Sequence, residues 1–264
     1  MLTNFKYLVG AVVLTVSLLF TATFYKAKSA LSASFYSQDN HSRNLPTLDY
    51  ETEVTKPKSK ERKDKGKHFK GSANPDTRKP IDELPEGVEP LPITGAWWRG
   101  LSALPIEQSD VVVLGVVTSR EAHLSEDRTG IYSEFTVLVS EVIKDPAKTI
   151  ISGTPISVNR SGGAVRFKSG KIQNYQLAHQ GMPDVNAQHV LFLRKTSDGD
   201  LLILTGFKLV NGHVTPLDGN ENNDPRLVLP FAKFAGTDEA EFLKAVRDAA
   251  TSSAKDVLSR NSRN

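Results

Sequence analysis

Alternating hydrophobic and polar positions dominate the second half of the chain and predict β-strands. Val111–Ser119 is almost wholly apolar and rich in β-branched residues, as in a central strand buried on both faces, and Gly115 marks an expected bulge or sharp bend. Residues 131–143 alternate over thirteen positions, with Ile131, Phe135 and Val139 on one face. Shorter strands are predicted at residues 156–160, 164–167, 171–173, 190–195 and 201–207, and a hairpin at Asn211-Gly212 joins residues 208–210 to 213–215.

Helical patterns are few. Residues 104–109 predict a short helical turn, with Pro105 at a position suited to a first turn. A C-terminal helix is predicted to begin near Thr237, because acidic residues stand at its start and an apolar stripe runs from Phe242 to Ala250. Six to seven strands followed by one helix predict a mainly β fold, a small barrel or sandwich closed by that helix.

The N-terminal residues 1–28 have the character of a membrane-directing segment. Tyr7–Tyr25 is an unbroken run of nineteen uncharged residues between Lys6 and Lys26. A helix of that length matches the ~30 Å hydrocarbon core of a bilayer. We favour an uncleaved transmembrane anchor that contacts membrane lipid, with a cleaved signal peptide as the alternative. Either interpretation predicts an extracytoplasmic domain, membrane-anchored or secreted.

Residues 29–96 have the composition of a disordered linker, with seven of the fourteen prolines and no hydrophobic period. Within them, Thr55–Gly71 carries eight Lys or Arg residues against Glu61 and Asp64, a net charge of +6. Such a run is typical of segments that bind anionic lipid or polymer, or of a soluble spacer. Nucleic acid is not an expected partner, because the run lacks interleaved aromatic residues. The folded domain is expected at 97–250, where Trp97-Trp98 packs one edge, with a flexible tail at 251–264.

Several strand sequences together carry a family resemblance. SDVVVLGVVTS (residues 109–119), YSEFTVLVSEVIKDP (132–146), a Gly-Gly turn, HVLFLRK (189–195) and LLILTGF (201–207) resemble uncharacterised secreted bacterial proteins. Their domain is similar to the OB-fold of the tissue-inhibitor-of-metalloproteinase and netrin families, which implies an OB-like barrel over residues 104–217. That inhibitor family acts through an N-terminal cysteine held by disulfides. This chain has no cysteine, so only the fold is implied.

A positively charged surface is the predicted ligand-binding site. Ser161-Gly162-Gly163 lies between Arg160 and Arg166 and is either a backbone anion nest or a tight turn. The candidate ligand-binding residues are Arg160, Gly162, Gly163, Arg166, Lys168, Lys171 and His179. Their expected partner is an envelope protein or an anionic polymer.

No pattern in the sequence demands catalysis, a cofactor or a metal. The six histidines lack metal-ligand spacing. Asp218–Asp224 offers alternating oxygen ligands but lacks the EF-hand glycine, so we interpret it as a flexible loop. The alternatives to a binding domain are an envelope hydrolase, in which His179 or His213 would pair with Asp184 or Asp218, and a structural assembly module.

Overall fold

The computed structural model describes residues 45–73, 79–90, 93, 96–219 and 229–261, with side chains as far as residue 255. These residues belong to one compact unit, 39–264. The predicted membrane-directing segment Tyr7–Tyr25 lies outside the described residues. None of the helices in the described part is long and apolar enough to span a membrane.

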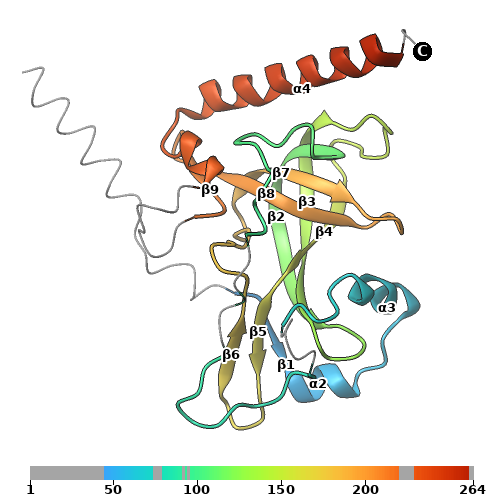
Figure 1. Ribbon diagram of the computed structural model, residues 1–264, viewed down its shortest axis with the longest axis vertical. Coiled ribbons are helices and arrows are strands. Elements are labelled where there is room, and N and C mark those ends of the chain that lie inside the picture. The colour runs from blue at the N-terminus through green and yellow to red at the C-terminus, as the bar shows by residue number, and fades with distance from the viewer. Residues whose placement is uncertain (1–44, 74–78, 91–92, 94–95, 220–228, 262–264) are drawn as a thin grey trace, which may run out of the picture. The chain divides into compact units, whose positions relative to one another are not determined.

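Nine strands and three α-helices make up the described secondary structure, together with one 3-10 helix (Figure 1). The strands are β1 (Thr47–Asp49), β2 (Val111–Leu124), β3 (Ile131–Lys144), β4 (Pro155–Ser161), β5 (Gly163–Arg166), β6 (Ile172–Tyr175), β7 (Gln188–Lys195), β8 (Leu201–Val210) and β9 (His213–Pro216). The helices are α2 (Tyr50–Thr55), α3 (Lys60–Lys67), the 3-10 helix η2 (Pro230–Phe234) and α4 (Glu239–Asn261). The prediction of a mainly β fold with a C-terminal helix is confirmed.

The strands form two sheets. One has three strands in the order β1-β5-β6, and the other has six in the order β4-β3-β2-β7-β8-β9. Strand β4 also pairs with β8, in parallel, through Val158 and Asn159. All other pairings of the larger sheet are antiparallel.

Strand β2 is buried on both faces, as its apolar sequence predicts. Val113 and Val117 face one core cluster with Phe135 and Leu191, whereas Val112 faces a second cluster under α4. The β2–β3 pairing shifts register at Gly115, which confirms the expected irregularity. A Cβ at that position would lie 2.6 Å from the carbonyl oxygen of Leu138, so only glycine allows the two strands to approach this closely.

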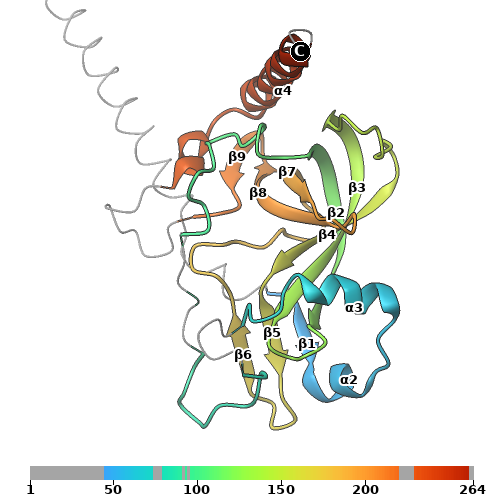
Figure 2. The ribbon, with the colours of Figure 1, turned by 45° about the vertical axis from the view of Figure 1, so that its right-hand side comes forward.

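The linker prediction for residues 29–96 is wrong for residues 45–73 and 79–90. Strand β1 pairs in parallel with β5, and α2 and α3 lie beside the end of the β2–β3 hairpin (Figure 2). Leu48, Phe69 and Ile81 are each at most 5% exposed. These three apolar residues are too far apart in sequence to form a period, so the composition conceals their burial.

The C-terminal helix begins close to its predicted start and ends later than predicted. The Asp238 carboxylate accepts hydrogen bonds from the backbone N–H groups of Ala240 and Glu241, as an N-cap does. Helix α4 then continues to Asn261, through most of the segment predicted as a flexible tail. Residues 104–109 contain a hydrogen-bonded turn, as predicted, in which the Ser109 N–H donates to the carbonyl of Ile106.

Candidate functional site

Arg160 is buried and belongs to an ion-pair network, so its prediction as a surface ligand residue is wrong. Its Nη2 donates to both carboxylate oxygens of Asp218 at 2.7 and 2.8 Å, and its Nη1 donates to the carbonyl of Gly181 at 2.6 Å. Asp218 also accepts from the hydroxyl of Thr205 and the N–H of Gly181. The guanidinium carbon lies 5.6 Å from the ring centre of Trp97. The charges of Arg160 and Asp218 are therefore paired with each other inside the protein.

At Gly162 and Gly163 the chain lies close to the backbone of neighbouring segments, so the pair does not form an open anion nest. Both glycines are buried with positive φ angles of 102° and 157°. The N–H of Gly162 donates to the carbonyl of Ile131, and a Cβ on Gly163 would lie 3.2 Å from the carbonyl oxygen of Pro46. The glycines therefore allow β1 to pack against this corner.

The remaining predicted residues do not form one surface with Arg160. Arg166 and Lys168 are exposed near the β5–β6 turn, and the Lys171 ammonium donates to three carbonyls, of Leu84, Pro85 and Val88. Lys171 thus fixes residues 84–88 to the domain. The backbone of His179 has a left-handed conformation, with φ 65°. Its ring lies edge-on to the Trp98 ring, with 5.7 Å between the ring centres.

The carboxylates of the alternative hydrolase already have cationic partners. Asp218 is the buried partner of Arg160, and Asp184 forms an ion pair with Lys208 at 2.9 Å. The predicted oxygen-ligand loop continues from Asp218 into residues 220–228, which lie outside the described part of the chain. Within that part, no group of three or more acidic, histidine or cysteine side chains is placed to hold a metal ion.

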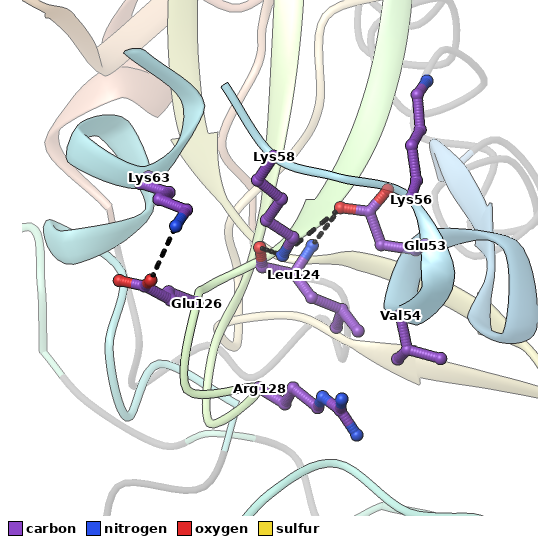
Figure 3. Close-up of a pocket in the computed structure, with 8 residues that line it drawn as sticks. All are labelled: Glu53, Val54, Lys56, Lys58, Lys63, Leu124, Glu126 and Arg128. Atoms are coloured by element: carbon purple, nitrogen blue, oxygen red, sulfur yellow. Dashed lines mark hydrogen bonds and ion pairs between the residues drawn. The ribbon is translucent and has the colours of Figure 1, made fainter. Parts of the chain in front are cut away.

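A small basic pocket lies where α2, the start of α3 and the β2–β3 turn meet (Figure 3). Its volume is about 160 Å³. Four cationic and two acidic side chains line it, which gives a net formal charge of +2. The charged lining residues are Lys56, Lys58, Lys63, Arg128, Glu53 and Glu126.

Lys58 forms the fixed side of the pocket. Its ammonium donates to the carbonyls of Leu124 at 2.6 Å and Ser125 at 3.3 Å, and lies 3.6 Å from the Glu53 carboxylate. Burial lowers the pKa of Lys58 below its usual value, and the charge of Glu53 acts in the opposite direction. Glu53 also accepts from the N–H of Leu124, so this pair joins α2 to β2.

The other cations of the pocket remain accessible. Lys63 lies 3.4 Å from Glu126 with nearly half of each side chain exposed, and Lys56 and Arg128 are exposed without an ion pair among the described contacts. Exposed surface pairs of this kind are weak and are screened by salt. Sequence reasoning identified the basic run but placed it in a linker, and it missed Arg128, which comes from a turn more than fifty residues later.

Comparison with known proteins adds no family. No protein-family model matches the chain, and no curated protein is significantly similar to it in sequence.

Proposed function

We propose that this chain is a non-enzymatic envelope protein, membrane-anchored or secreted, whose OB-like domain binds a phosphate-rich anionic polymer or lipid surface. The observation that carries the proposal is the basic pocket. It places Lys56, Lys63 and Arg128 around one hollow, although they come from different elements. Several cations gathered around one hollow attract a polyanion more strongly than the small net charge of the chain would.

The OB-like part of the proposal is supported by the strand pairings. Strands β2, β3, β4, β8 and β7 pair in a cycle that returns to β2, and the β4–β8 pair is the parallel one. Such a cycle leaves no free edge among these five strands, as a small Greek-key barrel requires. The membrane-anchored or secreted location rests on Tyr7–Tyr25.

Binding of soluble polyphosphate and of vesicles tests the proposal. The full chain should bind both polyphosphate and phosphatidylglycerol vesicles, and its affinity for polyphosphate should fall as salt rises. Replacing Lys56 and Arg128 with glutamate should weaken polyphosphate binding at least tenfold. The matched control is Lys148→Glu, an exposed charge reversal in the β3–β4 loop, at the opposite end of β3 from the β2–β3 turn, which should change affinity less than twofold.

The two ligands separate the two sources of phosphate. Loss of polyphosphate binding with vesicle binding unchanged would assign the pocket to a soluble polymer, because Tyr7–Tyr25 alone can hold the chain on lipid. If the Lys56→Glu/Arg128→Glu variant bound both ligands as the unaltered protein does, the proposed function would be wrong.

A further inference from the structure

Helix α3 is held on the domain by charge rather than by apolar burial. Its eight residues, Lys60 to Lys67, include no apolar side chain. A short helix without an apolar stripe gains little from packing and is marginal by itself in water. Its stability therefore depends on the contacts that its cations make with the body of the protein.

Those contacts fall on an acidic surface that spans several elements. Arg62 lies 3.7 Å from a carboxylate of β2, Lys63 3.4 Å from one in the β2–β3 turn, and Lys65 2.8 Å from one of β3. His68, just after the helix, lies 3.4 and 3.8 Å from two carboxylates of the β7–β8 turn. We call the residues opposite the helix the acidic surface: Glu121, Glu126, Glu134, Asp198 and Asp200.

Lys65 is the central contact of α3. The residue is only 7% exposed, and its ammonium donates to Glu134 at 2.8 Å and to the hydroxyl of Ser157 on β4 at 3.4 Å. Burial alone would lower the pKa of Lys65, but Glu134 and Glu61 raise it above its usual value. The ammonium therefore stays charged, and this one ion pair joins the helix to β3.

Polar atoms beneath α2 and α3 lack hydrogen-bond partners. His123 is 3% exposed and Tyr132 is fully buried, yet neither ring nitrogen of His123 nor the Tyr132 hydroxyl makes a hydrogen bond with the described residues. Tyr132 stacks on Phe69, which follows α3, at 4.6 Å, and the Glu53 carboxylate of α2 is 3.9 Å from His123. Buried polar groups without partners are unfavourable, so this covered surface is poorly matched to its cover.

We propose that the acidic surface is a docking site for a Lys/Arg-rich helical segment of a partner protein, and that α3 occupies it in cis until such a segment displaces it. The chemistry of the occupant follows from α3 itself. Its Arg62, Lys63 and Lys65 each face one carboxylate, and His68 after the helix faces the remaining two. Ease of displacement follows from the lack of apolar contacts in the helix and from the unpartnered polar atoms under the cover. This site takes the opposite charge from the basic pocket, although the two share the Lys63–Glu126 pair.

A synthetic peptide of residues 55–71 is the probe, and its binding to the full chain is measured by fluorescence anisotropy. Lys65→Glu places two carboxylates opposite each other and should release α3. The peptide should then bind at least tenfold more tightly than it binds the unaltered protein. Lys67→Glu is the matched control, because Lys67 is exposed on the same helix and its ion pair is with Asp64 of that helix, whereas Asp198 and Glu126 act on it only as more distant charges. The affinity of the Lys67→Glu variant for the peptide should stay within twofold of the affinity of the unaltered protein.

Glu134→Lys separates release of the helix from recognition of the surface. It breaks the same ion pair as Lys65→Glu but removes an acidic group from the surface, so it should not gain peptide binding. If Lys65→Glu prevented folding, as circular dichroism would show, Arg62→Glu would take its place, because Arg62 lies at the partly exposed edge of the contact. Equal peptide affinity for the releasing variant and the unaltered protein, or a similar gain in Lys67→Glu or Glu134→Lys, would overturn the proposal.

Discussion

Removal of Arg160 should destabilise the domain strongly, because the arginine is the cationic partner of a carboxylate with no solvent access. The Arg160 and Asp218 side chains are 1% and 0% exposed, and two hydrogen bonds of 2.7 and 2.8 Å join them. In Arg160→Met the Asp218 carboxylate keeps only the donors of Thr205 and Gly181. An uncompensated buried charge of this kind typically lowers the free energy of unfolding by about 3–5 kcal/mol.

A double-mutant cycle separates the pair from its surroundings. Asp218→Asn keeps an oxygen for Thr205 but removes the charge, so it should also destabilise. The free energy of unfolding that the double variant Arg160→Met/Asp218→Asn loses should be smaller than the sum of the two single losses. The difference should be about 1–3 kcal/mol. The control is Arg166→Met on the neighbouring strand β5, which is exposed and should change the free energy of unfolding by no more than about 0.5 kcal/mol.

Urea unfolding of the full chain provides the assay. Trp97 lies against the Arg160 guanidinium, so tryptophan fluorescence reports this region, and far-ultraviolet circular dichroism reports the sheets. Both probes should give the same midpoint shift for Arg160→Met. If Arg160→Met were no more destabilising than Arg166→Met, Arg160 would not be the buried partner of Asp218, and its interpretation as a surface residue would return.

Three further predictions concern other parts of the domain. Burial lowers the pKa of His123 to about 3, so below pH 6.5 the unfolded state binds a proton that the folded state does not. His123 should therefore lower the free energy of unfolding by roughly 2–3 kcal/mol between pH 7 and 4.5, and the buried His189, whose pKa is lowered to about 4, should add to this fall. In urea unfolding at the two pH values, the fall should be smaller for His123→Phe than for the unaltered protein by about the His123 contribution. Gly115→Ala should lower stability by about 1–3 kcal/mol because its Cβ would meet the Leu138 carbonyl, whereas Gly219→Ala, with open space around it, should leave the melting temperature nearly unchanged. Arg247→Ala removes two exposed hydrogen bonds from α4 to Glu141 of β3. It should lower the free energy of unfolding by at most about 1 kcal/mol, and by less at high salt. A larger decrease that salt does not reduce would contradict this prediction.

The strands could be predicted because their burial leaves a local signature. Both faces of β2 are covered, so it reads as a continuous apolar run, and β3 alternates because its two faces differ. Even so, β2 extends to Leu124, five residues beyond its predicted end. Its later residues, such as Arg120 and Glu121, are polar and contribute little to an apolar pattern.

The site could not be predicted, since its positions depend on contacts between distant segments. Nothing in the sequence around Arg160 distinguishes it from a surface arginine of a strand, and its partner Asp218 is fifty-eight residues away. The basic run resembles a spacer because α3 carries no apolar residue, and the carboxylates that hold it come from four later segments. Charge complementarity at this distance leaves no periodic trace in the sequence.

Hydrogen exchange of the full chain, followed by mass spectrometry, tests most directly whether the basic segment is part of the folded domain. Both the basic pocket and the acidic surface depend on that placement. The account predicts slowed exchange in α3, where the Lys63 N–H donates to the Ser59 carbonyl, and at Ala164, whose N–H donates to Pro46 of the segment before β1. Exchange of residues 56–71 at the rate of an unstructured peptide would contradict it.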